Sequence, residues 1–334
     1  MKDSSRGTER SFGYPSVVQP LFDVKEISVF KSLRFVVALF TSALALPLLS
    51  VSLAGATNRS PQCIVSLSPT ATSTLYAIGA GPQVQAVDKY SNYPAQGLPR
   101  KRIDAFNPSV EGIVGICKKS AAHPSTKPDL VIISYDANSI KQKLTALGVR
   151  VVQQDAPVSL GDAFNQVKQL GLLTGHVLRA RQLASSLSRT ISSDIASIPR
   201  HPSQVINVYY ELDPTYYSLT SGTFVGALLK ALGLVNIADA KSTSADAGYP
   251  QLNSEYIVSA SPQLIFLADT ICCRVTPGVV AARPGFASIS AVQHNHVVGL
   301  NDSVASQWGP RLGLLMNLLT AAVKRVLHDP RLWS

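Results

Sequence analysis

Short apolar runs alternate with stretches of helical periodicity over most of the chain after residue 63. The strand-like runs in the first half are 64–67, 84–87, 129–134 and 149–154, and the helix-like stretches between them are 70–79, 108–116 and 138–147. Runs that are apolar on both faces and separated by helices are typical of parallel sheets covered by helices on each side. This pattern predicts an α/β lobe over residues 57–158.

The same alternation begins again near residue 205 and predicts a second α/β lobe over residues 200–334. Its strand-like runs are VINVYY (205–210), QLIFLA (263–268) and HVVGL (296–300), and its helix-like stretches are 223–233 and 254–260. A last amphipathic stretch, 310–327, predicts a helix that closes the chain.

The segment between the two lobes has helical periodicity throughout. Over residues 159–199, apolar residues recur every three or four positions until Pro199 ends the run, and Gly171 and Gly175 are the positions where an interruption would fall. A helix of about 40 residues is about 60 Å long, which is enough to span both lobes. The pattern therefore predicts one long rigid helix that joins them.

The first 56 residues have a different composition. Residues 1–34 are polar and mixed in charge, whereas Phe35 to Ala56 contains no charged residue and ends in small ones. A basic flank, an apolar core and a small-residue ending are typical of an export signal, here with a polar N-terminal extension and cleavage after Ala56. An uncleaved membrane anchor is the alternative. Thr57 stands where a lipoprotein needs cysteine, so we expect an extracytoplasmic protein, periplasmic or at the cell surface, without a lipid anchor.

Composition narrows the classes of function. The 334 residues are 46% hydrophobic and 15% charged, with a net charge of +10. The basic residues are scattered, and their tightest group is Arg100, Lys101 and Arg102. Proteins that bind nucleic acids concentrate basic residues on one face and interleave aromatic residues with them. Nucleic-acid binding is therefore not expected.

The chain contains four cysteines: Cys63, Cys117, Cys272 and Cys273. In an oxidising compartment four cysteines indicate disulfides, with three alternative pairings. The adjacent Cys272 and Cys273 would bond to each other only through a strained ring, so bonds from this pair to Cys63 and Cys117 are favoured. A zinc site is the alternative, but no Cys-x-x-Cys motif and no His pair at helical spacing accompanies them, so no metal site is predicted.

Motifs for catalysis are missing from the sequence. There is no Gly-x-Ser-x-Gly, no Gly-x-Gly-x-x-Gly and no phosphate-binding Gly-Lys-Ser/Thr. His294 and His296 stand two residues apart at the start of a predicted strand, where we expect a structural role. The protein is therefore predicted not to be an enzyme and to have no cofactor of its own.

Aromatic residues gather where strands are predicted to end. The residues at these ends, or in the loops just beyond, are Tyr90, Tyr93, Phe106, Tyr135, Tyr209, Tyr210, Tyr216, Tyr217, Tyr249 and Trp308. In open parallel sheets these edges line the ligand crevice. Tyr and Trp present large rigid faces with a polar tip, which suits a bulky planar ligand. Ordinary packing is the alternative for any single Tyr, but the set predicts a ligand cleft.

Each predicted lobe also has an acidic residue that opens a helix ahead of a Pro-led buried strand. These residues are Glu111, before the strand at 127–132, and Glu255, before the strand at 261–266. Such a Glu often only interacts with the helix dipole. The alternative is a pair of exposed carboxylates, one per lobe, that docks a two-fold symmetric partner. The first copy carries an extra segment, 117–126, which predicts a surface loop.

The motifs KYSNYP, FNPSVEGIV, KPDLVIIS, LDPTYYSLTSGTFVG and QWGPRL resemble those of the substrate-binding proteins of ABC importers for cobalamin and ferric siderophores. The resemblance extends over residues 64–312. It implies two α/β lobes joined by one long rigid helix, the class III periplasmic-binding-protein architecture, with little hinge motion. The 117–126 insertion and the Cys272-Cys273 pair are not general features of this family.

The resemblance also assigns roles to individual residues. Glu111 and Glu255 match the carboxylates that dock onto arginines of the permease dimer in the membrane. The predicted ligand-binding residues, including two placed only by their strand-end loops, are Tyr90, Tyr93, Phe106, Tyr135, Tyr210, Tyr249, Asp302 and Trp308.

The implied function is that of an exported, monomeric receptor that captures a metal chelate and delivers it to an ABC permease. Cobalamin is the first choice of ligand, and haem or a ferric siderophore is the alternative. A surface sensor and an extracellular enzyme on the same scaffold are alternatives of another class.

Overall fold

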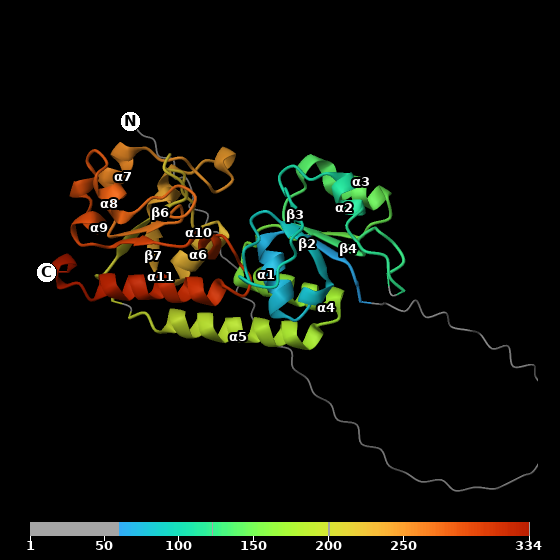
Figure 1. Cartoon of the computed structure of the whole chain (residues 1–334). Coiled ribbons are helices and arrows are strands. Elements are labelled where there is room, and N and C mark those ends of the chain that lie inside the picture. The colour runs from blue at the N-terminus through green and yellow to red at the C-terminus, as the bar shows by residue number, and fades with distance from the viewer. Residues whose placement is uncertain (1–59, 122, 200, 334) are drawn as a thin grey trace, which may run out of the picture. The chain divides into compact units, whose positions relative to one another are not determined.

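The computed structural model describes residues 60–121, 123–199 and 201–333 (Figure 1). The chain divides into two units, Met1–Ala56 and Thr57–Ser334, and the described residues belong to the second. The predicted export signal or anchor lies outside the described residues. The second unit contains two parallel sheets flanked by helices, which confirms the predicted α/β fold class.

The first lobe is built on a five-stranded parallel sheet in the order β3-β2-β1-β4-β5. Its strands are β1 (Ile64–Leu67), β2 (Val84–Asp88), β3 (Arg102–Ile103), β4 (Leu130–Ile133) and β5 (Val151–Gln153). Its helices are α1 (Pro69–Ala77), α2 (Val110–Val114), α3 (Ile140–Ala146) and α4 (Leu160–Thr174). Alternate strand residues face opposite sides: Ile64 packs with α1 and α4, whereas Val65 packs with α2 and α3.

The second lobe has a four-stranded parallel sheet in the order β7-β6-β8-β9. Its strands are β6 (Ile206–Glu211), β7 (Leu234–Asn236), β8 (Leu264–Leu267) and β9 (Val297–Gly299). Its helices are α6 (Phe224–Ala231), α7 (Ser254–Ala260), α8 (Pro277–Ala281), α9 (Ser290–Gln293), α10 (Asp302–Ala305) and α11 (Leu312–Leu327). Phe266 packs toward α6 and α11, and Ile265 packs toward α7, α8 and α9.

The linking segment corrects one prediction. Instead of one helix over 159–199, the chain forms α4 and then α5 (Val177–Ala196). Gly175 ends α4 with a φ of 81°, in the left-handed region that favours glycine. The two helices pack tightly, because a Cβ added to Gly171 would lie 2.3 Å from the Ala180 Cβ. Periodicity continues through this turn because both helices bury an apolar stripe, so the pattern alone hides the break.

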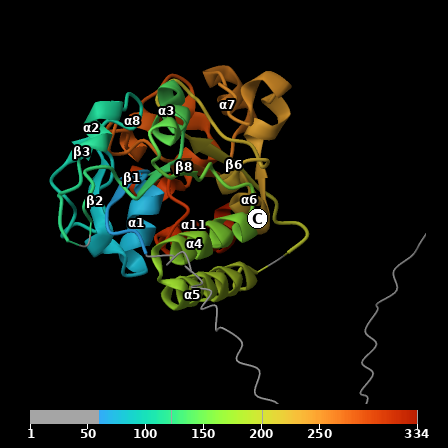
Figure 2. The same cartoon turned by 90° about the vertical axis from the view of Figure 1, so that its right-hand side faces the viewer.

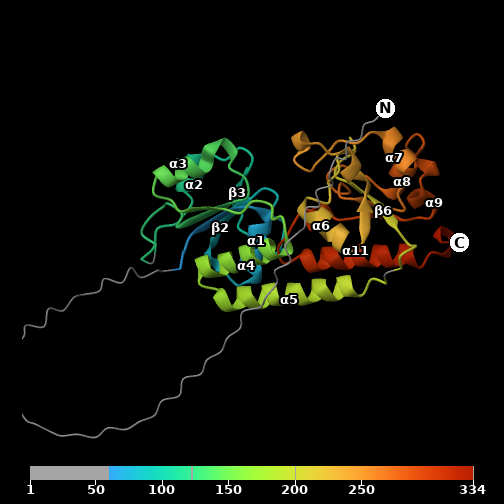
Figure 3. The same cartoon turned by 180° about the vertical axis from the view of Figure 1, so that it is seen from behind.

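One helix nevertheless joins the lobes. With 20 residues, α5 is about 30 Å long. Figures 1 and 3 show α5 running below both sheets, beside α11. Most of α4 packs on the first lobe, and Ala163 near its start packs into the core of the second. The linking helix is therefore half as long as predicted.

The cysteine pairing also differs from the prediction. Cys63 and Cys117 form a disulfide with a Cα–Cα distance of 6.0 Å, and Cys272 and Cys273 are exposed free thiols. The predicted bonds between the two pairs are wrong because Cys63, before β1, and Cys117, after α2, belong to the first lobe, whereas the other two follow β8. The disulfide anchors the predicted loop 117–126 at its first residue, and His123 is buried 3.2 Å from the Asp129 carboxylate.

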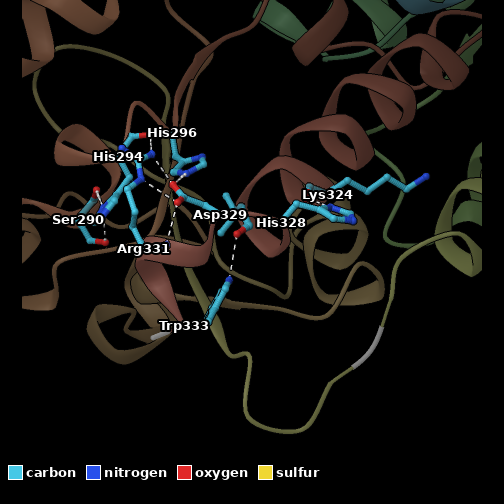
Figure 4. A network of polar contacts seen from close by, with 9 residues as sticks. Ser290, His294, His296, Lys324, His328, Asp329, Arg331 and Trp333 are labelled. Carbon is cyan, nitrogen blue, oxygen red and sulfur yellow. Dashed lines mark hydrogen bonds and ion pairs between the residues drawn. The ribbon is translucent and has the colours of Figure 1, made fainter.

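A polar network ties the end of the chain to the second sheet (Figure 4). The Nε2 atom of buried His296, just before β9, lies 3.0 Å from Asp329 Oδ2, and Arg331 donates to the same carboxylate at 2.6 and 2.8 Å. The hydrogen bonds from Arg331 and His296 lower the pKa of Asp329. The His294 ring stacks on that of His296. Both histidines therefore make structural contacts.

We expect the disulfide to contribute measurably to stability. The double substitution Cys63→Ser with Cys117→Ser should lower the free energy of unfolding by about 2–4 kcal/mol. Without the crosslink the unfolded chain has more conformational entropy, which favours unfolding. Denaturant titration checks this. The matched control, Cys272→Ser with Cys273→Ser, should change the unfolding free energy by less than about 0.5 kcal/mol, since both thiols are exposed and unbonded. Equal losses in both variants would contradict the observed pairing.

Candidate ligand-binding cleft

Two adjoining hollows lie at the carboxyl ends of the strands. The large chamber, of about 760 Å³, is lined by segments that follow β1, β2, β3 and β4 in the first lobe and β8 and β9 in the second. The small chamber, of about 460 Å³, is lined mainly by the second lobe. Five residues line both chambers, and we call them the junction: Cys272, Asp302, Ser306, Gln307 and Trp308. The cleft thus occupies the sheet edges where the aromatic pattern predicted it.

The first lobe contributes an exposed aromatic wall. Tyr90, Phe106 and Tyr135 are exposed and line the large chamber, and the rings of Tyr90 and Phe106 meet edge to face at 5.8 Å. Aromatic rings on a concave surface provide an apolar contact area for a large ligand.

A buried network holds the loop that carries Tyr90. Asp88, the last residue of β2, accepts hydrogen bonds from the Tyr90 N–H at 2.8 Å and from the Ser91 hydroxyl. The Ser91 and Thr72 hydroxyl oxygens lie 2.9 Å apart, in hydrogen-bond contact, which connects the loop to α1. Burial raises the pKa of Asp88 despite these donors. The aromatic wall therefore rests on a fixed backbone.

In the second lobe, three of the predicted ligand-binding residues line the cleft and one is buried in the core. Half-buried Tyr249 lines the small chamber, and Asp302 and Trp308 line both chambers. Tyr210 borders the small chamber but is 0% exposed, with its ring 6.1 Å from that of Phe266, so it belongs to the core rather than to the cleft surface. Its inward direction follows from the strand pleat, which places alternate residues of β6 on opposite faces.

Tyr93 also differs from the expectation. It does not line either chamber, and its ring lies 5.0 Å from the Arg311 guanidinium at the start of α11. This contact is a cation–π interaction between the two lobes. Tyr93 therefore holds the rim of the cleft in this structure.

Two further hydrogen bonds cross between the lobes at the cleft. The Trp308 indole N–H donates to Gln166 Oε1 of α4 at 2.7 Å, and the Asn92 amide donates to the Ser303 hydroxyl at 2.7 Å. Both connect a loop of one lobe to the other lobe beside the lining residues. Neither bond could be predicted from the sequence, because the partners are more than 100 positions apart.

The Asp302 side chain holds the backbone of the loop after β8. Its carboxylate accepts the N–H groups of Ile271 at 3.0 Å and Cys272 at 2.7 Å. Burial alone would raise the pKa of Asp302, but these donors hold the pKa below its usual value. The predicted polar ligand contact is therefore first a clamp on the backbone of the Cys272-Cys273 loop. Burial and the neighbouring Cys273 and Asp302 raise the pKa of the Cys272 thiol to about 12.

A buried charge cluster under this loop was missed in the sequence. Glu211 ends β6, and both its carboxylate oxygens accept hydrogen bonds from Arg283 at 2.6 and 2.7 Å. Asp269, just after β8, is fully buried beside them. Burial and the Glu211 charge raise the pKa of Asp269 to about 7. The signal was an acidic residue directly after each of the predicted runs 205–210 and 263–268, since parallel neighbours end at one edge.

We expect this cluster to make stability depend on pH. The pKa of Asp269 is higher in the folded than in the unfolded chain, so its contribution is present below the usual carboxyl range and is lost as the pH rises toward neutrality. Asp269→Asn removes the titration while Glu211 and Arg283 remain. Relative to this variant, wild type should lose unfolding free energy between about pH 4 and pH 7. Parallel denaturation curves over that range would refute the assignment.

The two candidate docking carboxylates lie on equivalent helices. Glu111 and Glu255 are exposed in the first turns of α2 and α7, which are capped by Ser109 and Asn253. The Glu111 backbone N–H and the Ser109 hydroxyl, which donates at 3.0 Å, lower the pKa of Glu111. Figures 1 and 2 show α2 and α7 on the side of each lobe that faces away from α5.

Within residues 60–121, 123–199 and 201–333, no three or more His, Cys, Asp or Glu side chains are arranged to hold a metal ion. Over the same residues, none of the helices combines the length and the apolar character needed to span a membrane. The cleft surface itself offers aromatic rings, hydroxyls, an amide oxygen and a thiol.

Two parallel α/β lobes on a linking helix, with a cleft at the facing strand ends, define a two-lobed ligand-binding protein. The family model described as "Periplasmic binding protein" matches residues 64–304. The chain therefore belongs to the periplasmic binding protein family, and the family inferred from its motifs is confirmed.

Known relatives share most of the chain. It is 27% identical over 264 residues to the uncharacterized ABC transporter substrate-binding lipoprotein YvrC of Bacillus subtilis, covering 76% of this chain and 77% of that one. It is 28% identical to a cobalamin-binding protein of Halobacterium salinarum, covering 76% and 67%. The periplasmic haem-binding protein RhuT of Roseiflexus sp. RS-1 has the same fold, with a TM-score of 0.67, 22% identity and coverage of 79% and 98%.

Proposed function

We propose that this protein is an exported, monomeric substrate-binding protein that captures cobalamin and delivers it to an ABC permease dimer. The observation that carries the proposal is the two-chambered cleft with exposed aromatic rings, shared between two lobes on one linking helix. The relative from Halobacterium salinarum, described as cobalamin-binding, and that from Bacillus subtilis, described as part of an ABC transporter, support it.

The charges of the cleft favour cobalamin over an anionic chelate. Lys89 is the only Lys or Arg among the residues that line the two chambers, and it is paired with Asp104 at 2.9 Å. The propionates of haem and the acidic groups of many siderophores need free cations or other strong donors. Cobalamin carries neutral amides around its ring, which hydroxyls and amides can satisfy.

Haem is the second candidate ligand. Tyr90 and Tyr135 are exposed on the wall of the large chamber, and a phenol oxygen can serve as an axial ligand to haem iron. This chemistry would hold the iron from the first lobe. A ferric siderophore has no comparable observation in its favour.

Calorimetry with the purified protein tests the ligand. We expect cyanocobalamin to bind with micromolar affinity or tighter and haemin to bind more weakly. Tyr249→Ala should weaken cyanocobalamin binding by about 1–3 kcal/mol, because the variant loses a ring from the small chamber.

Tyr217→Ala is the matched control for this variant. Tyr217 is 42% exposed against 43% for Tyr249, but it lines neither chamber, so its removal should leave the affinity unchanged. Binding of haemin with no response to cyanocobalamin would replace cobalamin by haem. An unchanged affinity in Tyr249→Ala would return that ring to ordinary packing.

The exposed acidic pair should matter for delivery rather than for capture. Glu111→Ala with Glu255→Ala should leave the ligand affinity intact and abolish uptake in cells that carry the cognate permease, because charge pairs guide and register the docking of two proteins. Radiolabelled ligand uptake measures this. Asp162→Ala is the control, since Asp162 also lies in a first helical turn beside a capping serine, but on α4. Normal uptake in the double variant would overturn the docking assignment.

A further inference from the structure

The junction between the two chambers contains polar groups whose hydrogen bonds can be accounted for one by one. The Asp302 carboxylate holds the N–H groups of Ile271 and Cys272. The Trp308 N–H is bonded to Gln166, and the Ser306 hydroxyl donates to the Asp302 backbone oxygen at 2.7 Å. The Cys272 thiol lies within hydrogen-bond reach of the Asp302 carboxylate and of Cys273, and the Gln307 amide oxygen is the buried junction atom without a partner among the described residues.

The unpaired amide oxygen of Gln307 indicates that the junction is built for a ligand. Gln307 is only 4% exposed, lines both chambers, and its Oε1 is buried without a hydrogen-bond partner among the described residues. A buried acceptor without a partner costs free energy, so proteins rarely retain one unless a ligand or water satisfies it. The oxygen accepts only from a donor, and the primary amides of a corrinoid are donors, whereas ionised propionates are not.

Cys272 provides a different kind of group at the same place. It is exposed, it lines both chambers, and its backbone is fixed by Asp302. A flat ligand that extends into both chambers has to pass the junction, and the metal of a tetrapyrrole or corrin lies at the centre of such a ligand. His and Met are absent from the lining of both chambers, so Cys272 is the one sulfur or imidazole group there.

We propose that the Cys272 sulfur occupies an axial position on the metal of the bound chelate, while Gln307 accepts a hydrogen bond from the periphery of that chelate. This inference rests on the proposed function. In the ligand exchange, a bond forms between Sγ and the metal, the bond between the metal and its axial water breaks, and the thiol proton passes to solvent. The oxidation state of the metal does not change. Thiolate sulfur is an established axial ligand of metal macrocycles.

Two forms of cobalamin separate ligand capture from sulfur ligation. Aquacobalamin has an exchangeable axial water, whereas cyanocobalamin holds its cyanide. On adding wild-type protein to aquacobalamin we expect the visible spectrum to shift to that of a thiolate complex, and with cyanocobalamin we expect binding without this shift. Cys272→Ser should lose the shift with aquacobalamin.

Cys273→Ser is the matched control, because Cys273 is an adjacent exposed thiol that lines neither chamber. It should retain the shift. A thiol-reactive dye should count two free thiols in wild type and one in each variant before the titration. Gln307→Leu should weaken the binding of cyanocobalamin, because a donor of the ligand then loses its acceptor.

The outcomes distinguish the two levels of the proposal. Normal cyanocobalamin binding without a shift for aquacobalamin in wild type, or a shift that survives Cys272→Ser, overturns the sulfur ligation and leaves the proposed function intact. If cyanocobalamin does not bind, cobalamin capture is refuted, and haemin with its cyanide complex takes the place of the two cobalamins in the same comparison. Failure of both chelates to bind overturns the inference together with the proposed function.

Discussion

The apolar stripe of α5 sets the distance between the two sheets, and the cleft depends on that distance. Ala180 and Ala184 of this helix pack into the core of the first lobe, whereas Leu187 and Ile191 pack into that of the second. Leu183 lies between them and contacts both cores. Because buried side chains interlock at high density, a helix that is embedded in both cores resists bending and sliding. The lobes are therefore held apart at a nearly fixed spacing.

This fixed spacing explains why the contacts across the cleft are few and peripheral. Trp308 with Gln166, Asn92 with Ser303 and Tyr93 with Arg311 join the lobes at the margins, and the interior between them stays open. The walls are rigid for a second reason: Asp88 and Asp302 each use their carboxylate to fix the loop that carries a lining residue. Such a cleft selects its ligand by preformed shape and chemistry rather than by closure.

The two lobes present different chemical groups to the cleft, so the two sides of a bound ligand would meet different contacts. The first lobe presents rings, whereas the second lobe brings a thiol, an unpaired amide oxygen and a buried acidic cluster close behind its surface. Asp269 lies in that cluster, and its backbone oxygen accepts the Cys273 N–H at 3.3 Å. The Cys272-Cys273 loop is thus held from one side by Asp302 and from beneath by Asp269. The Asp302 carboxylate also lies within hydrogen-bond reach of the Cys272 thiol.

The sequence by itself determined the two α/β lobes, the parallel order of elements and the aromatic lining from Tyr90, Phe106 and Tyr135, because strand and helix periods and the carboxyl-edge rule are local or follow directly from local structure. The short strands β3 and β7 were not predicted, since two or three residues are too few to show a periodic pattern of apolar positions.

Only the tertiary structure decided that the linking segment breaks, and does so at Gly175 rather than Gly171, and it alone decided the Cys63–Cys117 pairing and the burial of Tyr210. It also decided which polar groups of the junction are already satisfied. Each of these depends on which residues distant in the chain come to lie side by side, and the pattern of apolar and polar positions is the same whichever partner they find.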